Sequence, residues 1–253
     1  IADEALLRLA RSAGGDARRG LGTIERIALH FRQRALDAEP LSLEELSAAL
    51  GESGVLYDRS GDEHYNCVSA FIKSMRGSDP DAALYWLARM VEAGEDPMFL
   101  ARRLVIFASE DVGMADPRAL QVAIACKDAI HFLGLPEAKF PLAQAALYLA
   151  TAPKSNSSKG YFQAAAAVRE HGALPVPMPL RNAATPLMKE LGYGERYQYP
   201  PNYEGSFVAE EYLPEALGGQ RYYTPGDQGY EKMVTERLAV WGRRKESGHK
   251  KRK

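Results

Sequence analysis

Apolar residues recur every three or four positions along the first part of the chain, and this spacing predicts amphipathic helices. Residues 3–13 form the first such helix, and Gly14 and Gly15 end it. Asp16 can cap a second helix. Its apolar stripe is Ala17, Leu21, Ile24, Ala28, Phe31 and Ala35. A third, shorter helix begins at the capping box formed by Ser42 and Glu45.

The middle of the chain is more regular. Residues 62–76 read as a helix, and 157–170 as another. Between them, Pro136 and three Asp-Pro pairs predict helix starts, because Asp suits the N-cap and Pro the first helical position. The pairs are Asp79-Pro80, Asp96-Pro97 and Asp116-Pro117. The short intervening loops predict antiparallel neighbours and an all-α fold.

Residues 172–228 are rich in proline and tyrosine, which predicts an extended segment that wraps over the helical body. It contains one short helix near 184–191. A last helix is expected over 228–243, followed by a basic disordered tail at 244–253. A turn-rich stretch near residue 55 suggests a division into residues 1–54 and 55–243.

Composition narrows the functional classes. With 253 residues, 46% of them apolar, and a net charge of −1, the chain can bury a core and is not basic overall. Two cysteines suggest a reducing cytoplasm. His64 and Cys67 share a helix face but do not make a zinc site, so no metal is expected. No apolar run is long enough to span a membrane. Because the chain begins with Ile1, we expect it to be part of a longer protein.

Candidate chemistry is confined to anion contacts. The chain has no G-x-x-x-x-G-K-[ST] phosphate loop. Arg18 and Arg19 open the second helix, where a phosphate is the expected partner. In PKSNSSKG, Lys154, Asn156 and Lys159 could contact DNA or another anion. The alternative interpretation of PKSNSSKG is a helix stop at Pro153 followed by an Asn or Ser cap.

Several stretches resemble one family. GGDARRGLGTIE resembles the second sensor motif of clamp-loader-like AAA+ ATPases. Residues 57–125 resemble the C-terminal half of the bacterial replication-associated recombination protein A family, also called MgsA. The family's eukaryotic relative is the Werner-helicase-interacting ATPase. LATAPKSNSS, LPVPMPLRNA, LMKELGYG, EYLPEAL and RYY resemble the same family further along.

The resemblance implies an AAA+ lid over residues 1–54 and a collar-like helical domain that forms a homotetramer. It aligns Arg18, rather than Arg19, with the arginine that senses ATP, although Gly20 and Gly22 depart from the family pattern. The intact protein is expected to use ATP and Mg²⁺, whereas this chain, without a phosphate loop, is expected to be inactive alone.

The partners implied by the resemblance are single-stranded-DNA-binding protein and DNA at stalled forks, ends and single-stranded gaps. The expected location is the cytoplasm, in association with the nucleoid. Two alternatives stay open at this point: a non-enzymatic helical scaffold and a clamp-loader subunit.

Overall fold

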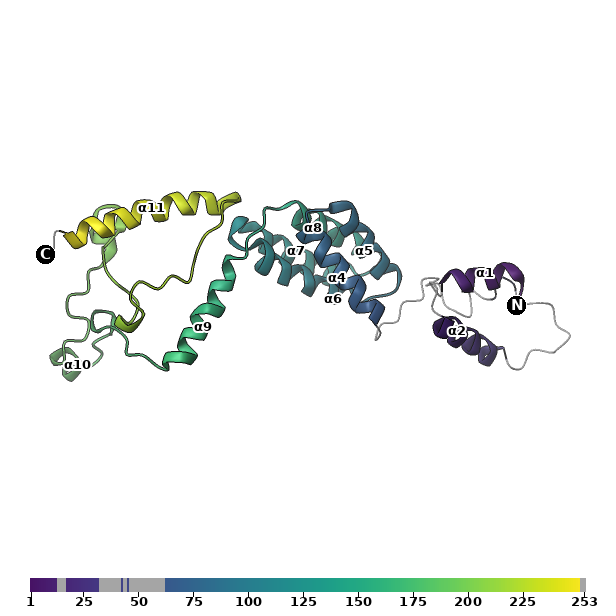
Figure 1. The fold of residues 1–253 in the computed structure, drawn as a ribbon, viewed down its shortest axis with the longest axis horizontal. Helices are drawn as coiled ribbons and strands as arrows, with labels where there is room; N and C mark the ends of the chain where they lie inside the picture. Colours follow the sequence, from purple (N-terminus) through teal and green to yellow (C-terminus); the bar gives the residue numbers. More distant parts are fainter. Residues whose placement is uncertain (13–16, 32–41, 43–44, 46–61, 251–253) are drawn as a thin grey trace. The chain divides into compact units, whose positions relative to one another are not determined.

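The computed structural model describes residues 1–12, 17–31, 42, 45 and 62–250, and these residues contain helices and turns but no strand (Figure 1). The predicted all-α class is therefore confirmed. The predicted boundary near residue 55 lies outside the described residues and stays a prediction. None of the described helices combines the length and apolar character that crossing a bilayer requires.

The first two helices form a pair. Helix α1 is Asp3–Ser12 and α2 is Ala17–His30. They meet along a small apolar seam in which Ala5, Leu9 and Ile27 are buried, with Phe31 packed against it. Further along, Ser42 and Glu45 exchange the two hydrogen bonds of the predicted capping box, at 2.9 and 3.2 Å.

Five helices follow: α4 (Asp62–Arg76), α5 (Pro80–Glu92), α6 (Pro97–Phe107), α7 (Arg118–Leu133) and α8 (Lys139–Thr151). Helices α4, α5 and α8 pack against one another. The largest side chains buried in these helices are Phe71, Phe107, Met75, Met90, Leu100, Leu104, Leu142 and Leu149. An ion pair of 2.6 Å between Lys139 and Glu92 joins the start of α8 to the end of α5.

Short turns connect these helices to the next part of the chain. Helix α6 continues into a short π-helix, η1 (Ala108–Val112), and a 3-10 turn, η2 (Gly113–Ala115). The 3-10 turn η3 (Ser157–Lys159) leads into α9 (Gly160–His171). The expected helix start at Pro136 is wrong, because α8 begins at Lys139. Residues 134–138 instead form a turn in which Ala138 N–H donates to the Gly134 carbonyl.

The remaining segment is mostly irregular, as its prolines predict. It contains α10 (Pro186–Glu190), capped by Thr185, and single turns at η4 (Met178–Leu180), η5 (Pro200–Asn202), η6 (Glu204–Ser206) and η7 (Glu215–Leu217). Helix α11 runs from Gly229 to Lys250. Residues 244–250 are thus helical, in contrast to the disordered tail expected there, and 251–253 lie outside the described residues.

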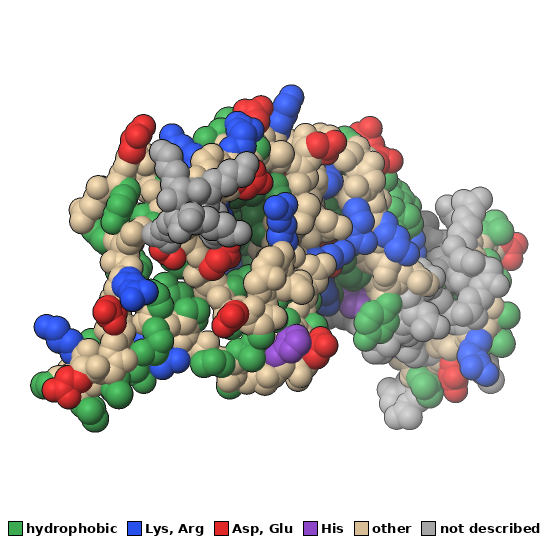
Figure 2. All heavy atoms as spheres, turned by 60° about the vertical axis from the view of Figure 1, so that its left-hand side comes forward, with side chains coloured by type: hydrophobic (Ala, Val, Ile, Leu, Met, Phe, Trp, Pro, Cys, Tyr) green, Lys and Arg blue, Asp and Glu red, His purple; other side chains and the backbone are tan. Residues whose placement is uncertain are grey.

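By its contacts the chain divides into two units, residues 1–105 with 122–151, and residues 106–121 with 152–253. Among residues 152–247, whose burial the structure describes, few apolar residues are buried: Ala152, Val208 and Leu217. On the face drawn in Figure 2, hydrophobic side chains reach the surface between charged ones.

Candidate functional site

Arg18 is the second residue of α2 and is exposed, and no acidic residue occupies the first turn of that helix. The helix N-terminus supplies partial positive charge, and the guanidinium adds a full charge with a planar fork of donors. Buried Ile27 and Thr23 fix the opposite face of α2. This end of the helix therefore suits an anion. The side chain of Arg19 and residues 13–16 lie outside the described part of the chain.

The three predicted contact residues of the loop 153–160 differ in their surroundings. Lys154 is half-buried, and its ammonium group donates to the Ala152 carbonyl at 2.6 Å. Burial lowers the pKa of Lys154, and the charge of Asp111 partly offsets that shift. Asn156 and Lys159 are exposed. Two of the three residues are therefore open to solvent, and Lys154 is engaged within the chain.

The serines of the same loop face a carboxylate of the chain itself. Glu231, in the first turn of α11, is fully buried. It accepts hydrogen bonds from the Tyr223 hydroxyl at 3.1 Å and the Gly226 N–H at 2.8 Å. The Ser155 hydroxyl donates to Ser157 Oγ at 3.0 Å, and both serines help to lower the pKa of Glu231. The anion that this loop contacts is therefore the Glu231 carboxylate of the same chain.

The protonation of this cluster follows from its contacts. Burial alone would raise the pKa of Glu231, but the hydrogen bonds from the two serines, Gly226 and Tyr223 outweigh it, and the pKa lies below its usual value. Burial, together with the hydrogen bond to Glu231 and its charge, raises the pKa of Tyr223 to about 12. At neutral pH the cluster therefore holds an ionised carboxylate and a neutral phenol.

Two glycines let the backbone segments approach closely here. A Cβ on Gly160, the first residue of α9, would collide with the Tyr222 carbonyl. Gly229 has φ +52°, and a Cβ there would collide with the Ala115 carbonyl and come within 2.7 Å of Pro153. Ser155 N–H also donates to the Asp111 carbonyl at 2.8 Å. The loop is therefore packed between η1, η2, the start of α9 and the segment before α11.

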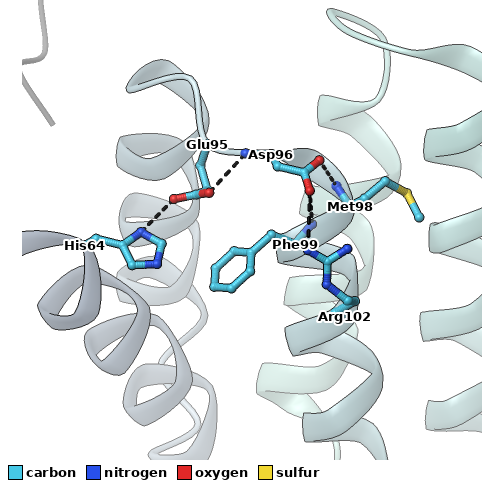
Figure 3. Close-up of polar contacts among 6 residues, drawn as sticks. All are labelled: His64, Glu95, Asp96, Met98, Phe99 and Arg102. Carbon is cyan, nitrogen blue, oxygen red and sulfur yellow. Dashed lines mark hydrogen bonds and ion pairs between the residues drawn. The ribbon is translucent and has the colours of Figure 1, made fainter. Parts of the chain in front are cut away.

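A second polar cluster joins α4 to the α5–α6 connection (Figure 3). His64 Nδ1 lies 2.7 Å from Glu95 Oε2, and both side chains are nearly buried. The other oxygen of Glu95 accepts from the Asp96 N–H at 3.1 Å. Asp96 in turn caps α6 by accepting from the N–H groups of Met98 and Phe99 at 2.9 and 3.1 Å.

The contacts of this second cluster indicate a structural role. The His64 ring lies beside Phe99, with ring centroids 5.2 Å apart, and Figure 3 shows no nucleophile among the residues drawn. Within the described residues, no group of three or more His, Cys, Asp or Glu side chains could hold a metal ion. His64 and Glu95 therefore link α4 to the α5–α6 connection. The sequence pointed to His64 but gave no signal for Glu95.

Comparison with known families covers nearly the whole chain. A family model described as "MgsA AAA+ ATPase C terminal" matches residues 77–242, and one described as "AAA C-terminal domain" matches residues 1–76.

Individual relatives agree. The replication-associated recombination protein A of Escherichia coli is 45% identical over 241 residues, covering 94% of this chain and 54% of the relative. That of Haemophilus influenzae is 42% identical over 257 residues, covering 100% of this chain and 57% of the relative. The ATPase WRNIP1 of Dictyostelium discoideum is 37% identical and covers 87% of this chain and 27% of the relative. The chain thus spans about half the length of these two bacterial relatives.

Proposed function

Because this chain belongs to the MgsA AAA+ ATPase C-terminal family, we propose that it is the lid and oligomerisation portion of a DNA-dependent AAA+ ATPase. The observation that carries the proposal is the order of the two matches, an AAA C-terminal domain at 1–76 followed by the MgsA C-terminal region at 77–242. The names of the bacterial relatives support a role in replication-associated recombination. The substrates proposed are stalled forks, DNA ends and gaps.

Arg18 is proposed to read the nucleotide state. Its exposed position in the first turn of α2 lets the guanidinium reach a phosphate when the lid closes over ATP. ATP and Mg²⁺ would be held mainly by residues outside this sequence, which has no phosphate loop. What this chain contributes is one positive charge and its donor geometry. Alone, it is proposed to be inactive.

The helical part is proposed to form a homotetramer. Phe132 and Phe140 are 88% and 79% exposed in the single chain, and α9 buries none of its residues. Apolar surface of this kind is typical of subunit contacts. The further partners proposed are DNA and single-stranded-DNA-binding protein, in the bacterial cytoplasm at the nucleoid. Asn156 and Lys159 stay candidates for DNA contact because they are exposed.

The test is ATP turnover by the longer protein that contains this sequence. Arg18→Ala should lower turnover about 100-fold, the usual cost of removing one preorganised donor to a developing charge. Arg18→Lys should restore only part of it, because an ammonium lacks the planar fork. Glu25→Ala, an exposed change on the same helix, is the matched control. Unchanged turnover in Arg18→Ala would remove the sensing role, and no turnover in the unsubstituted protein would remove the ATPase assignment.

A further inference from the structure

Positive charge is concentrated at the end of the chain, in residues 243–253, called here the basic end. It holds seven Lys and Arg and one Glu. The whole chain has 32 Lys and Arg against 33 Asp and Glu, so the other 242 residues carry 25 cations against 32 anions. A polyanion is therefore repelled by the net negative charge of those 242 residues and attracted to the basic end.

The structure holds the start of the basic end in place. Trp241 of α11 stacks on Phe207, with ring centroids 6.4 Å apart and an interplanar angle of 13°. Lys245 pairs with Glu211 at 2.6 Å, and the Arg244 guanidinium lies against Gly205. One face of α11 is thereby fixed to the segment 205–211.

Helix geometry then determines where the next cation lies. Arg243 is two residues after Trp241, about 200° around the helix at 3.6 residues per turn. It is exposed on the face away from Phe207, Glu211 and Gly205. The contacts of α11 with segment 205–211 therefore set the orientation of the helix and leave Arg243 accessible to a ligand.

We propose that the basic end binds the phosphate backbone of nucleic acid. From Gly242 to Lys253 no side chain is apolar. An amphipathic membrane helix needs an apolar face, and a protein interface needs aromatic or aliphatic anchors. A phosphate backbone needs only cations, which release its counterions. The composition of the basic end fits that partner.

Stabilisation of the helix does not account for this many cations. Lys and Arg near a helix C-terminus interact favourably with the macrodipole, but the effect is limited to the last turn. Here Arg243, Arg244 and Lys245 lie before the last turn of α11, which is described to Lys250. Their mutual repulsion is offset when a polyanion binds.

The inference deepens the proposed function, since it places a DNA contact, but its test needs no ATP. The 253-residue chain with Trp86→Phe keeps Trp241 as its only tryptophan, close to Arg243. A fluorescein-labelled oligo-dT is titrated between 50 and 200 mM salt and followed by anisotropy, with Trp241 fluorescence as a local reporter.

Two variants remove charge from the basic end. Arg243→Gln with Arg244→Gln removes two cations, and Gln at Lys250, Lys251, Arg252 and Lys253 removes four. At about 0.7 released counterions per phosphate contact on single strands, the slope of log K against log salt should become shallower by about 1.4 and 2.8. The control, Lys73→Gln with Arg76→Gln, removes two cations from the end of another helix, α4.

The expected result is a loss of affinity of about tenfold or more at low salt in both basic-end variants and none in the control. Circular dichroism checks that the helices persist. If the double variant loses helix, the fourfold variant still decides the question. Equal binding by all variants would overturn the proposal. The proposal would also be overturned if Lys159→Gln lost binding while the basic-end variants kept it. Tighter binding to phosphatidylserine vesicles than to the oligonucleotide would overturn it as well.

Discussion

Glu231 is the residue whose environment is most unusual for its type. Carboxylates are rarely fully buried unless their oxygens are paired, and this one accepts from the Tyr223 hydroxyl and the Gly226 N–H, with Ser155 and Ser157 also lowering its pKa. The contact with Glu231 accounts for the two serines of the loop 153–160. From sequence patterns alone, these serines could serve either as a helix cap or as contacts to a bound anion. The donors are present, but Glu231 occupies them, and no local signal connects residue 231 with that loop.

Replacing this carboxylate gives a pH-dependent prediction. Glu231→Gln should lower the free energy of unfolding at pH 7 by about 2 kcal/mol, because charge-assisted hydrogen bonds are lost. The pKa of Glu231 is lower in the folded chain than its ordinary value of 4.5. Its contribution is therefore complete above about pH 4.5 and is lost as pH falls through the folded pKa. Urea unfolding at pH 7 and at pH 3.5 should show the gap between wild type and variant narrowing.

The control for that prediction lies on the same helix. Glu236 of α11 is exposed, so Glu236→Gln should leave the stability unchanged at both pH values. A Glu231→Gln protein as stable as wild type at pH 7 would mean that desolvation cancels the hydrogen bonds. A gap that did not narrow at pH 3.5 would assign the loss to packing.

At the scale of elements, the sequence predicts a helix start well where an Asp cap marks it, and helix ends less well. Starts follow from caps that act within three residues: Asp79 Oδ1 accepts from Ala82 N–H at 2.9 Å, and α5 begins at Pro80 as expected. The end of α11 depends on tertiary contacts. The stack on Phe207 and the pair with Glu211 stabilise turns that an isolated basic sequence would lose.

The polar cluster around Asp96 and Glu95 likewise contains one contact that local sequence predicts and one that depends on packing. Asp96 is identifiable as a cap from its Asp-Pro pair, and it accepts the expected backbone hydrogen bonds. Glu95 beside it and the pairing with His64 depend on how α4 packs beside the α5–α6 connection. Sequence patterns encode the first kind of contact and not the second, because packing brings residues together without a fixed spacing.

Two helical glycines should respond oppositely to alanine. At Gly242 of α11 a Cβ meets nothing within 4 Å, so Gly242→Ala should stabilise the chain by about 1 kcal/mol. At Gly160 of α9 the same Cβ would collide with the Tyr222 carbonyl. Gly160→Ala should therefore displace segment 222–223, weaken the Tyr223–Glu231 hydrogen bond and destabilise. Paired denaturation curves measure both, and a stabilised Gly160→Ala protein would contradict the close approach.

At the scale of the whole molecule, α9 exposes large apolar side chains and buries none of its residues. Tyr161 and Val168, on one stripe of α9, are 74% and 63% exposed, and α9 has no buried residue. A helix this short gains most of its stability from packing an apolar face. We therefore expect the stripe to be covered in solution, and a second copy of the chain is the partner that the proposed assembly supplies.

Light scattering on the 253-residue chain tests this assembly. The expected mass is that of four chains of 27.8 kDa, and it should persist at high salt, because apolar burial is not screened as ion pairs are. Tyr161→Ser with Val168→Ser should shift the mass toward smaller species at low concentration, since each buried apolar side chain contributes about 1.5–3 kcal/mol. Gln163→Ser with Glu170→Ser places the same two serines at exposed positions on the opposite face of α9 and should leave the mass unchanged.

A mass of one chain at every concentration would show that no second copy covers the stripe. A tetramer that both double variants form equally well would place the subunit contact elsewhere, with the exposed Phe132 and Phe140 as the next positions to change.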